Sequence, residues 1–164
     1  MGITLVSQLD MTALRQTIAN LLQFPPSKVL DGETLNDVTT KAPYVVVKEV
    51  SSSEFGTNSR YDGTLEKETV TATNQSTISV QFYGNGSREM ASFLRTAFNS
   101  TLSVQAFNKI GVSVLQCAQV LSLPTAMGSG LEKRAQFDMT VGHNSVVKTS
   151  INRIENQPFK FEVN

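Results

Sequence analysis

Between Ala135 and Val141 every second side chain is apolar, and polar residues fill the positions between them. Successive side chains of a β-strand point to opposite faces, so this run predicts a strand with one face in a core and one toward solvent. Residues 78–83 alternate in the same way, as Ile-Ser-Val-Gln-Phe-Tyr. Two such strands in one chain predict a sheet that is packed on one side.

Further strands are predicted from β-branched and apolar runs. Tyr44–Val47 follows a proline and opens a strand to about residue 50, to which residues 67–83 return as the second arm of a long antiparallel hairpin. The mostly apolar stretch 112–120 predicts a strand in the middle of the sheet. Two more strands are expected at 146–154 and at the end of the chain, where Phe159, Phe161 and Val163 alternate.

Residues 51–65 separate the two arms of this hairpin and carry no hydrophobic periodicity. They are polar, contain Gly56 and Gly63, and begin with three serines. Such a composition predicts a long, flexible hairpin tip. Four acidic and two basic residues between 52 and 68 give this region a net charge of −2.

Helical spacing of apolar residues predicts three helices. The first covers about 8 to 23 and ends at Phe24-Pro25-Pro26, because a proline disfavours helix in the residue before it. The second follows Ser87, a suitable N-cap, and the third covers about 102 to 110 before Gly111. The predicted class is α+β in a single domain, 1–164: a mainly antiparallel sheet with a long β-hairpin, packed by an N-terminal helix and an inserted helix pair.

Composition excludes several classes of function. The 14 basic residues balance the 14 acidic ones, whereas nucleic-acid-binding proteins usually carry a basic excess. No run of 18 apolar residues exists to cross a membrane, and the first residues do not form a secretory signal. The single cysteine, Cys117, excludes an internal disulfide, so assembly in a reducing cytoplasm is expected. The weakly charged, polar composition suits packing against neighbours, although an ordinary soluble domain would fit it equally.

Candidate catalytic residues are few. His143 is the only histidine, in a Gly142-His143-Asn144 segment where two strands are expected to turn; a general base is conceivable, but a polar turn residue explains it better. Cys117 lies in an apolar run, where a buried thiol behaves as a small hydrophobe. One histidine and one cysteine cannot form a metal cluster of the usual kind within a single chain.

Two further patterns carry little chemistry. Gly84-Asn85-Gly86-Ser87 joins a strand to a helix, where phosphates often bind, but it lacks the lysine of a Walker loop and has Glu89 where the dinucleotide motif has its third glycine. A tight turn with an N-cap explains it. Glu66 and Glu68 adjoin the hairpin tip without the apolar surroundings that would separate two catalytic pKa values. The expectation is a protein that is not an enzyme and holds no cofactor or metal.

Three short motifs, in a particular order, resemble a known family. Ala42-Pro43-Tyr44-Val45-Val46-Val47 follows the first helix, Ser79–Gly86 reads SVQFYGNG and runs into the second helix, and Lys133–Gly142 reads KRAQFDMTVG. This order is similar to that of the phage neck or tail-terminator proteins. The resemblance covers residues 8 to 156, and its motifs are structural rather than chemical.

The resemblance implies a structural virion protein of the tail or neck, assembled in the host bacterial cytoplasm. It implies a homo-oligomeric ring, usually a hexamer, that caps the tail tube and joins it to the neck or head. The expected partners are further copies of the chain, the tail tube protein, and neck or head–tail connector proteins. DNA would pass through the ring without specific binding, and no membrane is involved.

Two alternatives stay open at this point: another head–tail adaptor or baseplate component, and a small ligand-binding or enzymatic α+β domain that uses the Gly84–Ser87 turn. The family supplies no catalytic residues. Interface residues are expected on the hairpin, because exposed aromatic side chains are favoured anchors of protein interfaces. The expected contact residues are Phe55, Arg60, Tyr61, Glu66 and Glu68.

Overall fold

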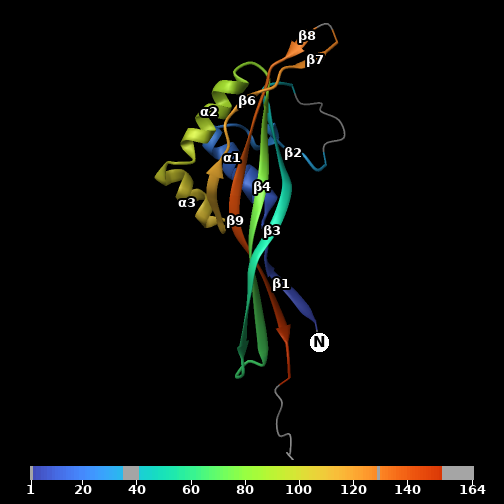
Figure 1. The fold of residues 1–164 in the computed structure, drawn as a ribbon, viewed down its shortest axis with the longest axis vertical. Coiled ribbons are helices and arrows are strands. Elements are labelled where there is room, and N and C mark those ends of the chain that lie inside the picture. The colour runs from blue at the N-terminus through green and yellow to red at the C-terminus, as the bar shows by residue number, and fades with distance from the viewer. Residues whose placement is uncertain (1, 35–40, 129, 153–164) are drawn as a thin grey trace, which may run out of the picture.

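A computed structural model describes residues 2–34, 41–128 and 130–152 and shows an α+β fold, as predicted (Figure 1). Within these residues one seven-stranded sheet has the order β1-β9-β4-β3-β2, and β5 and β6 also pair with β9. Its strands are β1 (Ile3–Ser7), β2 (Val29–Asp31), β3 (Tyr44–Asp62), β4 (Lys67–Tyr83), β5 (Val112–Cys117), β6 (Leu121–Ser122) and β9 (Arg134–Ser150). A separate small ribbon pairs β7 (Thr125–Met127) with β8 (Gly130–Glu132).

Three long strands form most of the sheet: β4 lies between β3 and β9 and runs antiparallel to both. The pairing of β2 with β3 is parallel, and the other pairings are antiparallel. The predicted long hairpin is therefore the β3–β4 pair, and β9 adds a third strand of nearly equal length beside it.

The helices α1 (Met11–Leu22), α2 (Ser87–Ala97) and α3 (Thr101–Lys109) cover one face of the upper part of the sheet, and a 3-10 turn, η1 (Pro26–Lys28), follows α1. The core between these layers contains the apolar positions of the alternating strands, including Phe82, Phe137 and Met139, and helix residues such as Leu14 and Leu94, all almost completely buried. The ring of Phe137 lies 5.9 Å from that of Phe82 and 6.0 Å from that of Phe98. The alternation read from the sequence thus identifies the core face correctly.

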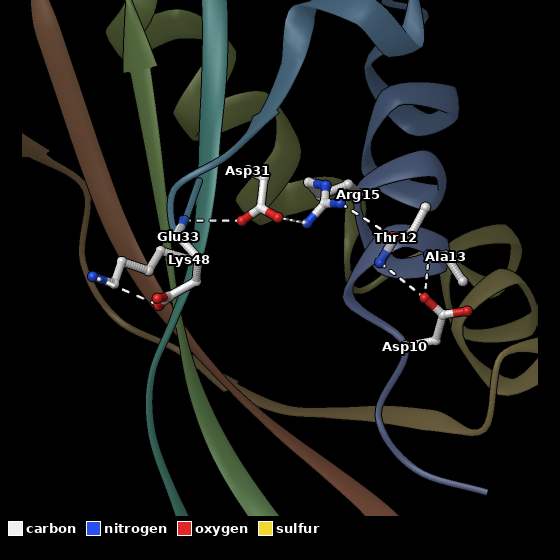
Figure 2. A network of polar contacts seen from close by, with 7 residues as sticks. All are labelled: Asp10, Thr12, Ala13, Arg15, Asp31, Glu33 and Lys48. Atoms are coloured by element: carbon white, nitrogen blue, oxygen red, sulfur yellow. Dashed lines mark hydrogen bonds and ion pairs between the residues drawn. The ribbon is translucent and has the colours of Figure 1, made fainter. Parts of the chain in front are cut away.

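Polar contacts fix the first helix to the edge of the sheet (Figure 2). The Asp10 carboxylate caps α1 by accepting hydrogen bonds from the backbone N–H groups of Thr12 and Ala13, at 2.9 and 3.0 Å. One turn later Arg15 forms an ion pair with Asp31 of β2 at 3.2 Å. Because β2 pairs with β3, these contacts link α1 to the long strands and hold it over the core.

The sheet divides into two regions along its length. The helix-covered part, with β2, β5 and β6, is called the head. The arm consists of β1 and the outer segments of the long strands, residues 3–7, 53–62, 67–75 and 144–150. Figure 1 shows these strands extending well beyond the three helices, and none of the described helices covers the arm on either side.

The structure corrects the prediction of a loop over 51–65. These residues are β-strand as far as Asp62, paired with β4 except at two β-bulges, at Val50 and Phe55, and the turn consists only of Gly63–Glu66. A strand shows apolar alternation only when one of its faces is buried, and in the arm neither face is. Main-chain pairing alone defines the strand here. The flexibility expected of this segment stays a prediction.

Other predicted boundaries were also wrong. Gly142-His143-Asn144 is not a turn, because β9 is one strand that includes the segment predicted to begin at 146. The 112–120 strand is shorter and lies at the edge of the sheet, paired only with β9. Gly86, at φ 77°, and not Ser87, occupies the N-cap of α2. β1 was not predicted, and the expected strand at 159–163 lies outside the described residues.

Candidate functional site: the β-arm and its junction with the head

A buried polar cluster marks the boundary between head and arm. Paired residues on adjacent strands share a face, and this register places Glu49 beside Ile78, Ser76 beside Val141 and His143 beside Asn74, all on the helix-covered side of the sheet where its apolar rows end. The Ser76 Oγ lies 2.6 Å from Glu49 Oε1, 2.8 Å from His143 Nε2 and 3.1 Å from Ser52 Oγ. Ser76 is completely buried and His143 is 9% exposed.

The single hydroxyl proton of Ser76 determines the chemistry of this cluster. The Ser76 hydroxyl donates a short, charge-assisted hydrogen bond to the Glu49 carboxylate, and its single proton lies in this bond. The imidazole must therefore donate its Nε2–H to Ser76 Oγ, and its Nδ1 is left as a buried acceptor without a partner among the described residues. A histidine in this tautomer cannot remove a proton from Ser76, and Glu49 contacts the serine rather than the imidazole. The cluster does not have the arrangement of a Ser-His-Glu triad, and its hydrogen bonds link β3, β4 and β9.

Burial lowers the pKa of His143, while the nearby Glu49 carboxylate raises it by a smaller amount. Protonation would place a second N–H, at Nδ1, in a buried position without an acceptor.

We expect this histidine to make the fold less stable in acid. An imidazole whose pKa is lower in the folded state binds protons more readily in the unfolded chain, so stability falls as pH drops below about 6.5 and stops falling below the folded-state pKa. Denaturant melts between pH 7.5 and pH 5 should show a decline that is smaller in His143→Gln, which keeps a polar side chain but does not titrate. Equal declines in both proteins would contradict this role of His143.

The arm exposes apolar side chains on an uncovered sheet. Ile3 is 74% exposed, Leu5 is 52% exposed and Tyr61 is 47% exposed. On the same face the register places Val70 and Val147 beside Leu5, both half-buried. Large apolar side chains gathered on one exposed surface are typical of protein interaction sites.

The five predicted contact residues all lie on the arm or its turn, but the structure does not bring them together. Tyr61 and Glu68 are direct partners across β3 and β4 and share a face. Arg60 points to the opposite face, and Glu66 lies in the turn with φ 49°. Phe55, 68% exposed, sits in a β-bulge between Glu54 and Gly56. Ile3 and Leu5 belong to the same surface as Tyr61, and sequence reasoning missed them because β1 was not predicted.

The remaining candidates have structural roles. Burial raises the pKa of the Cys117 thiol, and the opposing effect of Arg95 is smaller, so the reactive thiolate is disfavoured. Gly84, at φ 103°, brings the chain against Ala42 and Pro43, where a Cβ would lie 2.9 Å from the Ala42 Cβ. Across the described ranges no group of three or more His, Cys, Asp and Glu could hold a metal ion. None of the helices in those ranges is long and apolar enough to cross a membrane.

The three motifs that carry the family resemblance form one continuous patch of sheet. Tyr44 pairs with Tyr83, and Tyr83 pairs with Arg134, so the first residues of β3 and β9 and the last residue of β4 meet in one row. The two tyrosine rings stack at 4.8 Å, and the Arg134 guanidinium lies 5.3 Å from the centre of the Tyr83 ring. The motifs therefore specify the pairing of β3, β4 and β9, which is a structural role.

The packed head carries a long sheet arm that no described helix covers and that exposes apolar side chains, an arrangement typical of subunits that associate with other proteins. Residues 11–164 match the family described as phage neck terminator protein. The chain belongs to this family and has its structural role at the junction of head and tail in the phage virion. Membership implies association with other neck and tail components. No curated protein matches the chain.

Proposed function

We propose that the chain forms a homo-oligomeric ring, with six copies as the expected number, that caps the tail tube and joins it to the neck, leaving a channel for DNA. The uncovered apolar surface of the arm carries this proposal, because side chains such as Leu5 and Tyr61 need a partner surface that one copy does not supply among its described residues. Family membership supports the position in the virion.

A cap of this kind answers a geometric need. Subunits that stack head to tail make an interface without an intrinsic end, so a tube grows until something blocks its open face. A ring blocks it when one of its faces is complementary to the tube and the other face is not. On this proposal the tail tube protein contacts one face of the ring, and neck or head–tail connector proteins contact the other.

The charge of the chain suits a channel through which DNA passes without being held. Basic and acidic residues balance over the whole chain, and the segment 52–68 carries a net charge of −2. A mildly acidic surface repels phosphate groups, whereas a basic one would bind them and hinder ejection.

The mass of the purified protein tests the ring. We expect particles whose mass is a multiple of the 17.9 kDa subunit, six copies on the hexamer proposal, and ring-shaped images with a central hole in negative stain. Dilution should show the subunit and the ring without a ladder of intermediate sizes, because a closed ring satisfies every interface. A monomer at every concentration, or open chains of increasing length, would contradict the proposal.

A further inference from the structure

The register of the arm sorts its side chains onto two faces with different chemistry. One face continues the core side of the sheet and is here called the apolar face; it contains Ile3, Leu5, Tyr61, Val70, Ala72 and Val147. The opposite face is called the threonine face; it contains Thr4, Arg60, Thr69, Thr71, Thr73 and Lys148, together with one valine, Val146, which pairs with Thr71. Neither face is covered by a described helix.

The two faces also differ in charge. The apolar face carries two carboxylates, Glu54 and Glu68, at its two ends. The threonine face carries Arg60 and Lys148 on either side of Thr69. In the next row Lys67 lies beside Asp62 of the neighbouring strand. The apolar face is therefore acidic by two charges, and the threonine face is basic by two.

We propose that the apolar face of one arm packs against the threonine face of the arm of the next copy, and that this contact builds the ring. The inference rests on the proposed function and names the surface that it uses. The methyl groups of the threonines cover Leu5, Val70 and Val147 of the neighbour, and the basic rows of one copy meet the carboxylates of the other. The pairing buries apolar area and sets opposite charges together.

Charge selects this arrangement over the symmetric one. Two apolar faces packed together would bring four carboxylates into one contact, and two threonine faces would do the same with basic groups. Like charges across an interface cost several kcal/mol and exclude wrong pairings. A contact between unlike faces also leaves one free face at each end, so it propagates from copy to copy until the ring closes, whereas a symmetric contact would stop at a dimer.

Adjacent residues of the central strand β4 provide a matched pair for the test, because Val70 lies on the apolar face and Thr71 on the threonine face, both half-buried. Val70→Cys and Thr71→Cys are made separately in a Cys117→Ser background, which removes the native thiol. With a short bismaleimide we expect a mixture of the two variants to give covalent dimers, whereas each variant alone gives none.

Three outcomes would overturn the inference. Crosslinking of Val70→Cys with itself would show that like faces meet. A mixture that forms particles of ring mass but stays uncrosslinked would show that another surface, or residues 153–164, contacts the arm. That result would refute this contact and leave the ring proposal standing. A protein that is monomeric at all concentrations would refute the ring and this contact together.

A second pair of variants measures the contact without cysteines. Leu5→Asp places a charge on the apolar face, whereas Leu131→Asp changes a leucine that is 72% exposed on β8, outside the arm. Loss of a central apolar anchor should weaken self-association by roughly 10-fold or more in Leu5→Asp. Leu131→Asp should assemble as the unchanged protein does. Equal assembly of both variants, with circular dichroism showing that both are folded, would refute the proposed contact.

Discussion

Phe137→Ala should lower the free energy of unfolding by about 3–5 kcal/mol. Phe137 is 1% exposed, and its ring packs between Phe82 of the neighbouring strand and Phe98 after α2. Removing the ring loses the burial of its apolar surface and leaves a cavity between sheet and helices, which the packed neighbours cannot fill. Urea melts at neutral pH measure the change, at equal protein concentrations because association adds to apparent stability.

Phe93→Ala is the matched control. Phe93 is one residue from the buried Leu94 in α2, yet it is 56% exposed and does not belong to the buried core. Phe93 shares the helical spacing of the apolar residues in 90–98, but only Leu94 and Phe98 of these three residues are buried in the core. Truncation at this exposed position should change stability by less than about 1 kcal/mol. A loss below about 1 kcal/mol in Phe137→Ala would contradict the core described above.

The head could be predicted from the sequence because burial leaves a local pattern. Residues 135–141 alternate because one face of their strand packs under α2, and the spacing of Leu14 and Ile18 reflects the same core from the side of α1. Helix ends followed from local chemistry, such as Gly111 after α3, where φ is 72°. In the head, the spacing of apolar residues in the sequence matches the positions of the buried side chains in the structure.

The arm could be predicted only in part, because strands were expected at 67–83 and 146–154 but not at 51–62 or in β1, and the pairing of β4 with β9 was not expected. Its strands pair across long sequence separations, as Thr69 does with Lys148, and no residue within a few positions of either indicates that pairing. Neither face enters a core, so the polar run 51–62 shows no period and reads as a loop. β1 adds only five residues, and its place beside β9 depends on register alone.

The same limit applies to the candidate interface. Aromatic residues near the hairpin tip predict contact residues on the arm, and the structure shows that Phe55 and Tyr61 are exposed there. To assign these residues to one face of the arm or the other, the register of β3 with β4 must be known. That register puts Tyr61 and Glu68 on one face and Arg60 on the other. A surface that acts by complementarity of whole faces leaves no motif in the sequence, whereas a catalytic constellation would.

Loss of this gene from the phage should abolish infectious particles while leaving every enzymatic step of growth intact. Heads should form and package DNA, because packaging does not depend on the tail. Tails should lack their terminating ring, vary in length and fail to join heads, since an open head-to-tail interface has no intrinsic end. Electron microscopy of lysates measures tail lengths and the fraction of heads that carry tails. Expression of the intact chain from a plasmid should restore both, and the Leu5→Asp variant should restore neither if the arm contact builds the ring. Tails of uniform length joined to heads, in a lysate without this protein, would refute the terminator role whatever the fold.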